Sequence, residues 1–87
     1  MNPEKAAKFL IQKHPKGDLW DYAQNRPIWP DEWSEWRGWS TSEKKLYFLA
    51  LNLWNGAVFD DVKVDLYSVW NSLDREKEAL LMRALGV

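Results

Sequence analysis

The sequence predicts a compact all-α domain of four to five short helices, packed around a central buried helix at about residues 41–54. Three observations predict it. Apolar residues recur at helical spacing in several segments, capping signals precede these segments, and glycines follow most of them. Because a chain of 87 residues is long enough to enclose only one hydrophobic core, we expect a single domain over residues 1–87.

The first predicted helix covers about residues 3–13. Asn2 is a suitable cap, and Pro3 suits the first helical position because the N–H that it lacks would have no partner inside the helix. Turn-forming residues at 14–17 end the segment. The apolar residues with helical spacing are Ala6, Ala7, Leu10 and Ile11, with Phe9 alongside.

The following segment is predicted to be short and interrupted. Asp18 can cap a short helical turn over about residues 19–23. Pro27 and Pro30 then break any regular structure, because proline lacks the backbone N–H that helices and sheets use. We therefore expect a loop over residues 24–30.

Residues 30–37 are predicted to form another short helix, which Gly38 ends. The segment opens with a proline and two acidic residues, a combination that suits a first turn because the helix dipole is positive there. In such a helix Trp33 and Trp36 are three residues apart and share one face.

The central helix carries the clearest capping signal in the chain. Ser40 and Glu43 have the spacing of a capping box, and a strongly apolar run follows at residues 46–54. Apolar side chains on almost every side predict that this helix is buried. Gly56 suits the left-handed residue at its C-terminal end, and a buried Asn52 would need a backbone partner nearby.

Two further helices are predicted after residue 57. Residues 62–66 alternate like a strand, but a longer window over residues 58–73 fits a helix that Asp60 would cap. Its apolar positions are Phe59, Val62, Leu66, Val69, Trp70 and Leu73. Either Ser72 or Asp74 caps the last helix, which Gly86 closes. The apolar stripe of the last helix is Leu80, Leu81, Ala84 and Leu85.

Three motifs in the C-terminal half resemble a family. They are Leu49-Ala50-Leu51-Asn52-Leu53-Trp54-Asn55-Gly56, then Asp65-Leu66-Tyr67, then Leu73-Asp74-Arg75-Glu76. The pattern is similar to the C-terminal part of a family of small uncharacterised proteins, a domain of unknown function, from Gram-positive bacteria and their phages. The resemblance covers roughly residues 39–85. It implies a protein encoded by a phage or mobile element that acts inside a bacterium, and it implies no particular activity.

Composition excludes several classes of protein. The chain has no cysteine, so it contains neither a disulfide nor a thiolate nucleophile. No apolar stretch approaches the roughly 20 residues that cross a bilayer, and no signal peptide is visible, so we expect a soluble, cytoplasmic protein without membrane partners. The net charge of −1 provides no global attraction for nucleic acid or anionic lipid.

Candidates for catalysis are weak. The single histidine, His14, has no cysteine to share a metal with, and we expect it to be solvated. Asp61 and Asp65 are four residues apart and, with Asp60, could hold a divalent ion, but acidic residues at helix starts have an electrostatic reason to be there. We therefore expect no enzymatic activity, no metal and no cofactor, with a small metal-dependent enzyme as the least favoured alternative.

Nucleic-acid binding is the first alternative function. A basic group lies on or just after the first predicted helix, and tryptophans elsewhere could act as stacking platforms for bases. No arginine lies in this group to recognise a base edge. Its lysines are Lys5, Lys8, Lys13 and Lys16.

Four tryptophans lie between residues 29 and 39, and two interpretations of them stay open. Their rings can fasten a polar, proline-bounded lid to the core, or they can form a surface that binds a partner. Trp54 and Trp70 lie in strongly apolar predicted helices and should belong to the core, with Trp20 covering it from the side.

The leading hypothesis is a non-enzymatic protein–protein interaction module that binds a host or defence protein and inhibits it. Tryptophan beside arginine is typical of binding hot spots, and nearby acids would complement a basic patch on the partner. A symmetric homodimer is an alternative. The predicted partner-binding residues are Trp33, Trp36, Arg37, Trp39, Asp31, Glu32 and Glu35.

Overall fold

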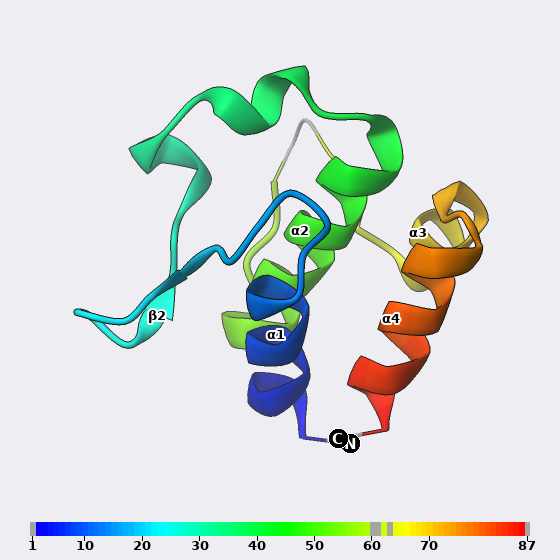
Figure 1. Cartoon of the computed structure of the whole chain (residues 1–87), viewed down its shortest axis with the longest axis horizontal. Coiled ribbons are helices and arrows are strands. Elements are labelled where there is room, and N and C mark those ends of the chain that lie inside the picture. The colour runs from blue at the N-terminus through cyan, green and yellow to red at the C-terminus, as the bar shows by residue number, and fades with distance from the viewer. Residues whose placement is uncertain (1, 60–61, 63, 87) are drawn as a thin grey trace.

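The computed structural model describes residues 2–59, 62 and 64–86, and most of them are helical (Figure 1). The prediction of a mostly helical fold is confirmed, but the described residues also contain a small two-stranded sheet, so the fold is not purely α. The elements in order are α1 (Pro3–Gln12), β1 (Trp20–Asp21), β2 (Arg26–Pro27), the 3₁₀ helices η1 (Pro30–Glu32) and η2 (Glu35–Gly38), α2 (Thr41–Asn55), α3 (Leu66–Ser72) and α4 (Arg75–Leu85).

Local capping signals define the ends of α1 and α2. The Asn2 side chain accepts the Lys5 N–H at 3.1 Å, as expected for the cap of α1. Ser40 and Glu43 form the predicted capping box at the start of α2. Gly56 follows α2 with φ of 78°, a left-handed conformation that glycine adopts without steric cost.

The predicted central position of α2 is confirmed. Residues 46–51 are all buried, so this helix turns every side of its middle toward other elements. α1 packs against both α2 and α4, and α3 packs against α2 (Figure 1). None of the helices among the described residues is long and apolar enough to cross a membrane.

The segment between α1 and η1 differs from the prediction, because it forms a β-hairpin. Trp20 and Asp21 pair antiparallel with Pro27 and Arg26, where a helical turn and a loop were expected. The Asp18 carboxylate accepts the Trp20 N–H at 3.0 Å, so it closes a turn and starts no helix. The strands are two residues long, which is too short for an alternating apolar pattern to reveal them.

The helix predicted over residues 58–73 begins only at α3. Phe59 and Val62 form an isolated antiparallel bridge, and both side chains pack in or against the core. The Asp65 carboxylate accepts the Ser68 N–H at 2.8 Å and caps α3. Asp60, the predicted cap, lies outside the described residues. No residue described between positions 58 and 65 is helical, so the helix predicted over residues 58–73 is correct only for Leu66–Ser72.

The helix predicted over residues 30–37 is divided into η1 and η2. Trp33 separates them with φ of −160° and ψ of 168°, which is extended backbone. Trp33 and Trp36 consequently do not share the face of one helix, and their rings pack in different places.

Candidate functional site

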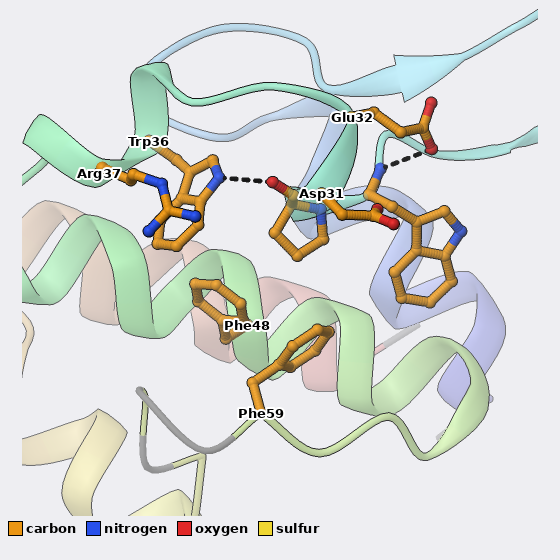
Figure 2. Close-up of a pocket in the computed structure, with 8 residues that line it drawn as sticks. Asp31, Glu32, Trp36, Arg37, Phe48 and Phe59 are labelled. Carbon is orange, nitrogen blue, oxygen red and sulfur yellow. Dashed lines mark hydrogen bonds between the residues drawn. The ribbon is translucent and has the colours of Figure 1, made fainter.

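A pocket of about 630 Å³ opens to solvent between the 29–37 segment and α2 (Figure 2). Its size lies within the range of about 300–1,000 Å³ that is typical of ligand sites. η1 and η2 bring four of the seven predicted partner-binding residues to it. The lining residues are Trp29, Pro30, Asp31, Glu32, Trp36, Arg37, Phe48 and Phe59.

The inner surface of the pocket is aromatic. Phe48 comes from α2 and Phe59 from the extended chain after it, and their ring centroids lie 4.7 Å apart in a T-shaped arrangement. Trp36 meets the Phe48 ring edge to face at 5.2 Å, and Trp29 lies 6.5 Å from Phe59. Such edge-to-face pairs are favourable and hold the rings in fixed orientations.

Trp36 is a wall of the pocket that belongs to the core. Only 7% of its surface is exposed, so of the two interpretations left open for the tryptophans, this ring fits the one in which it is packed against the core. Its Nε1–H donates to the Pro30 carbonyl at 2.9 Å and to the Trp33 carbonyl at 3.0 Å. The indole therefore buries its apolar surface, satisfies its polar group and fastens η2 to η1.

One charged residue of the pocket, Glu32, is paired with Arg26, which lies outside the pocket. The Arg26 guanidinium donates to the Glu32 carboxylate at 2.7 Å, and this hydrogen bond lowers the pKa of Glu32 below its ordinary value. Arg26 also donates to the Pro27 carbonyl at 2.9 Å, which connects the hairpin to η1. Glu32 thus has a structural partner within the chain.

The two other charged groups are Asp31 and Arg37. Both side chains are exposed, and neither forms an ion pair with another residue that the structure describes. The Arg37 guanidinium lies over the Trp36 ring, 4.7 Å from its centroid. This cation–π contact holds the exposed guanidinium beside the pocket.

Trp33 and Trp39 belong to a separate aromatic cluster, outside the pocket. The Trp33 Nε1–H donates to the Tyr47 hydroxyl at 3.2 Å, and that hydroxyl donates to the Ile28 carbonyl. Burial raises the pKa of Tyr47 to about 12, so the hydroxyl stays protonated and able to donate. Both tryptophans are half-buried, and Glu35 is exposed without lining the pocket.

His14 is buried in this cluster, so the expectation of a solvated histidine is wrong. It is only 4% exposed, and its ring stacks on Trp39 with centroids 4.7 Å apart. Its Nδ1 accepts the Lys16 N–H at 3.1 Å, so the neutral ring carries its proton on Nε2, which donates to the Glu43 carbonyl at 3.0 Å. Burial lowers the pKa of His14 and favours this neutral form.

The lysines of the nucleic-acid alternative have different surroundings. Lys5 and Lys13 are exposed. Lys8 lies over the Trp20 ring, 5.0 Å from its centroid, and Lys16 forms an ion pair with Glu43 at 3.8 Å. The described contacts of Lys8 and Lys16 are therefore to side chains of this chain.

The acidic group of the metal alternative is only partly described. Asp65 caps α3, whereas Asp60 and Asp61 lie outside the described residues. Among the residues that are described, no three histidine or acidic side chains are grouped closely enough to hold a metal ion.

Three further tryptophans and Asn52 are expected to be structural. Trp20 is buried, and Trp54 and Trp70 are half-buried against the core. The Asn52 side chain donates to the Ala57 carbonyl at 3.0 Å, which is the backbone partner beyond the end of α2 that its position required.

Sequence reasoning missed Phe48 and Phe59 as parts of the site. Phe48 lies in the most apolar helix, whose side chains are predicted to be buried, and it is only 2% exposed. Phe59 is predicted to lie in a helix, but α3 begins only at Leu66. No local pattern in the sequence indicates that Phe59 meets Phe48, because the pairing of the two rings depends on tertiary contacts. Comparisons of the chain with family models, with curated proteins and with solved structures find no match.

Proposed function

We propose that the chain is a non-enzymatic protein-binding module whose partner inserts an apolar side chain into the pocket beside η1 and η2. The observation that carries the proposal is the combination of an aromatic inner surface with an opening edged by Asp31 and Arg37. Binding hot spots combine such rings, which exclude water, with arginine at the rim. The pocket therefore has the composition of a site that recognises a protruding side chain.

The contacts of Trp36 and Arg37 support rigid, pre-organised binding. Trp36 is held by two hydrogen bonds, and Arg37 is stacked on it. Less conformational entropy is lost when a partner docks onto side chains that already have fixed positions. The pocket can therefore bind without rearranging the core.

The resemblance of residues 39–85 to proteins of bacteria and phages adds a context to the proposal. The chain would be encoded by a phage or mobile element and would act in the bacterial cytoplasm. Its partner would be a host or defence protein, and occupation of a functional surface on that protein would inhibit it.

The test is affinity capture from a bacterial lysate, treated or not treated with nuclease, with three forms of the tagged chain. The first is the wild type, and the second is the pocket variant Asp31→Lys/Arg37→Glu. The third is a control, Arg75→Glu/Glu76→Lys, which makes the same charge changes at two exposed positions in the first turn of α4. Both double variants retain the net charge of −1.

The proposal expects one protein to be captured by the wild type and the control, with nuclease present, and to be lost with the pocket variant. Equal capture by the pocket variant would contradict it. Capture that disappears on nuclease treatment would instead favour the nucleic-acid alternative, and Lys5 and Lys13 would be the first residues to mutate.

A further inference from the structure

Deepening the proposed function, and resting on it, we infer that the pocket recognises a dipolar protein segment. This segment has a large apolar side chain, a basic residue that faces Asp31 and an acidic residue that faces Arg37. The inference depends on the charges at the rim, which are opposite in sign and separate in position.

Figure 2 shows how these charges are arranged. Arg37 lies beside Trp36 at one end of the view, Glu32 lies at the other end, and Asp31 projects between them. Phe48 and Phe59 lie below the charged groups and face the same space. An apolar side chain resting on the partly exposed Phe59, with the buried Phe48 behind that ring, would therefore have Asp31 and Arg37 above it, within reach of its neighbours along the partner chain.

A purely cationic ligand fits this pocket poorly. Aromatic walls with a nearby acid attract cations, but Arg37 already covers one face of Trp36 and repels a second positive charge. Glu32 adds little attraction, because Arg26 lies 2.7 Å from its carboxylate.

A purely anionic ligand fits poorly as well. Arg37 alone could bind a carboxylate, since its guanidinium is exposed and held by stacking. The exposed carboxylate of Asp31 would then face the ligand with no cation opposite it. A segment carrying both charges satisfies Asp31 and Arg37 together and covers the aromatic surface between them.

The test is selection of binders from a phage-displayed library of random twelve-residue peptides on the immobilised full-length chain. We expect enriched peptides to contain an aromatic or large aliphatic residue with a base on one side and an acid on the other. Selection on Asp31→Lys should replace the preferred base by an acid. Selection on Glu35→Lys should keep the base, because Glu35 is an exposed acid of the same segment that does not line the pocket.

Individual peptides give the quantitative result. A wild-type binder should bind Asp31→Lys about tenfold more weakly or worse, since like charges then face each other. The affinity of the same peptide for Glu35→Lys should stay within about threefold of its affinity for the wild type, because Glu35 is an exposed charge outside the pocket.

The outcomes separate this inference from the proposed function. Enriched peptides that lose binding to Asp31→Lys/Arg37→Glu but show no paired charges would overturn the dipolar segment and leave the protein-binding pocket intact. Peptides whose binding ignores that double variant would overturn both. A dimer of the pure chain that the double variant converts to a monomer would show that the pocket holds a second copy, which also overturns the inference.

Discussion

At the scale of single residues, the tryptophans of the 29–39 segment mainly fasten it to the core. Trp36 is buried, and its indole N–H is hydrogen-bonded. The Trp33 ring packs against Tyr47, and the Trp39 ring stacks on His14. The lid interpretation therefore describes these rings well. Trp29 and Trp36 also line the pocket, together with Pro30, three charged residues of the same segment and two phenylalanines from elsewhere in the chain.

Trp36 provides the first prediction. Trp36→Ala should lower the free energy of unfolding by about 3–5 kcal/mol, because a large buried ring leaves a cavity. Trp36→Phe keeps most of the ring but leaves the Pro30 and Trp33 carbonyls without their donor, and should cost about 1–3 kcal/mol. Urea denaturation measures both values. An alanine variant as stable as the wild type would show that Trp36 is not part of the core.

His14 predicts a pH dependence of stability. Its pKa in the folded chain is lowered from the ordinary value of 6.5, so the unfolded chain binds more protons between the two values. The stabilisation is therefore complete above pH 6.5 and is lost as the pH falls through the folded-state pKa. The carboxylates with lowered pKa, Glu32, Glu43 and Asp74, lose their contribution at lower pH, from about 4.5 downward.

The comparison variant for this prediction is His14→Gln, which retains a side-chain amide that can donate to the Glu43 carbonyl. Free energies of unfolding between pH 8 and pH 5 should fall for the wild type and change much less for His14→Gln. Parallel curves for the two proteins would contradict the buried neutral histidine.

At the scale of elements, the sequence predicts well the helices whose signals are local. Asn2, Ser40 and Asp74 each cap the helix that follows, and Gly56 ends α2 as expected. The hairpin and the extended chain after α2 could not be predicted in this way. The two strands of the hairpin and the single bridge between Phe59 and Val62 are too short to show a period, and tertiary contacts hold them.

The turn of the hairpin provides a prediction at this scale. Asn25 has φ of 55°, a left-handed conformation that asparagine tolerates and β-branched residues do not. Asn25→Val should therefore lower the free energy of unfolding by about 1–2 kcal/mol, whereas Asn25→Gly should be nearly neutral. The Asn25 side chain is exposed, so side-chain packing contributes little to the difference in stability between the two variants. Equal thermal stability of the two variants would show that the turn has another conformation.

At the scale of the whole molecule, the pocket depends on contacts between distant parts of the chain. The sequence predicts Asp31, Glu32 and Arg37 as site residues, because charged residues beside tryptophan are typical of binding surfaces. The place of Phe48 and Phe59 in the pocket was not predictable, because it depends on how the 29–37 segment packs against Phe48 of α2 and against Phe59. The backbone of Trp33 is extended, so its ring packs against Tyr47 and away from Trp36. For this reason Trp33 does not line the pocket with the four predicted residues that do.

Stability and binding should separate in the pocket variant. Asp31 and Arg37 are exposed, so Asp31→Lys/Arg37→Glu should change the free energy of unfolding by less than about 1 kcal/mol, most of it from the lost stacking of Arg37 on Trp36. Circular dichroism during thermal unfolding checks this. A large loss of stability would mean that the effect of this variant on capture reflects unfolding.

The most direct test of the pocket as the binding site is a two-dimensional NMR spectrum of the indole N–H groups, recorded while the captured partner is added. The seven tryptophans provide two reporters in the pocket, Trp29 and Trp36, and five outside it, which are Trp20, Trp33, Trp39, Trp54 and Trp70. The pocket proposal predicts that the signals of Trp29 and Trp36 shift or broaden first and most strongly. Changes confined to Trp20, Trp54 and Trp70 would place the partner elsewhere and contradict it.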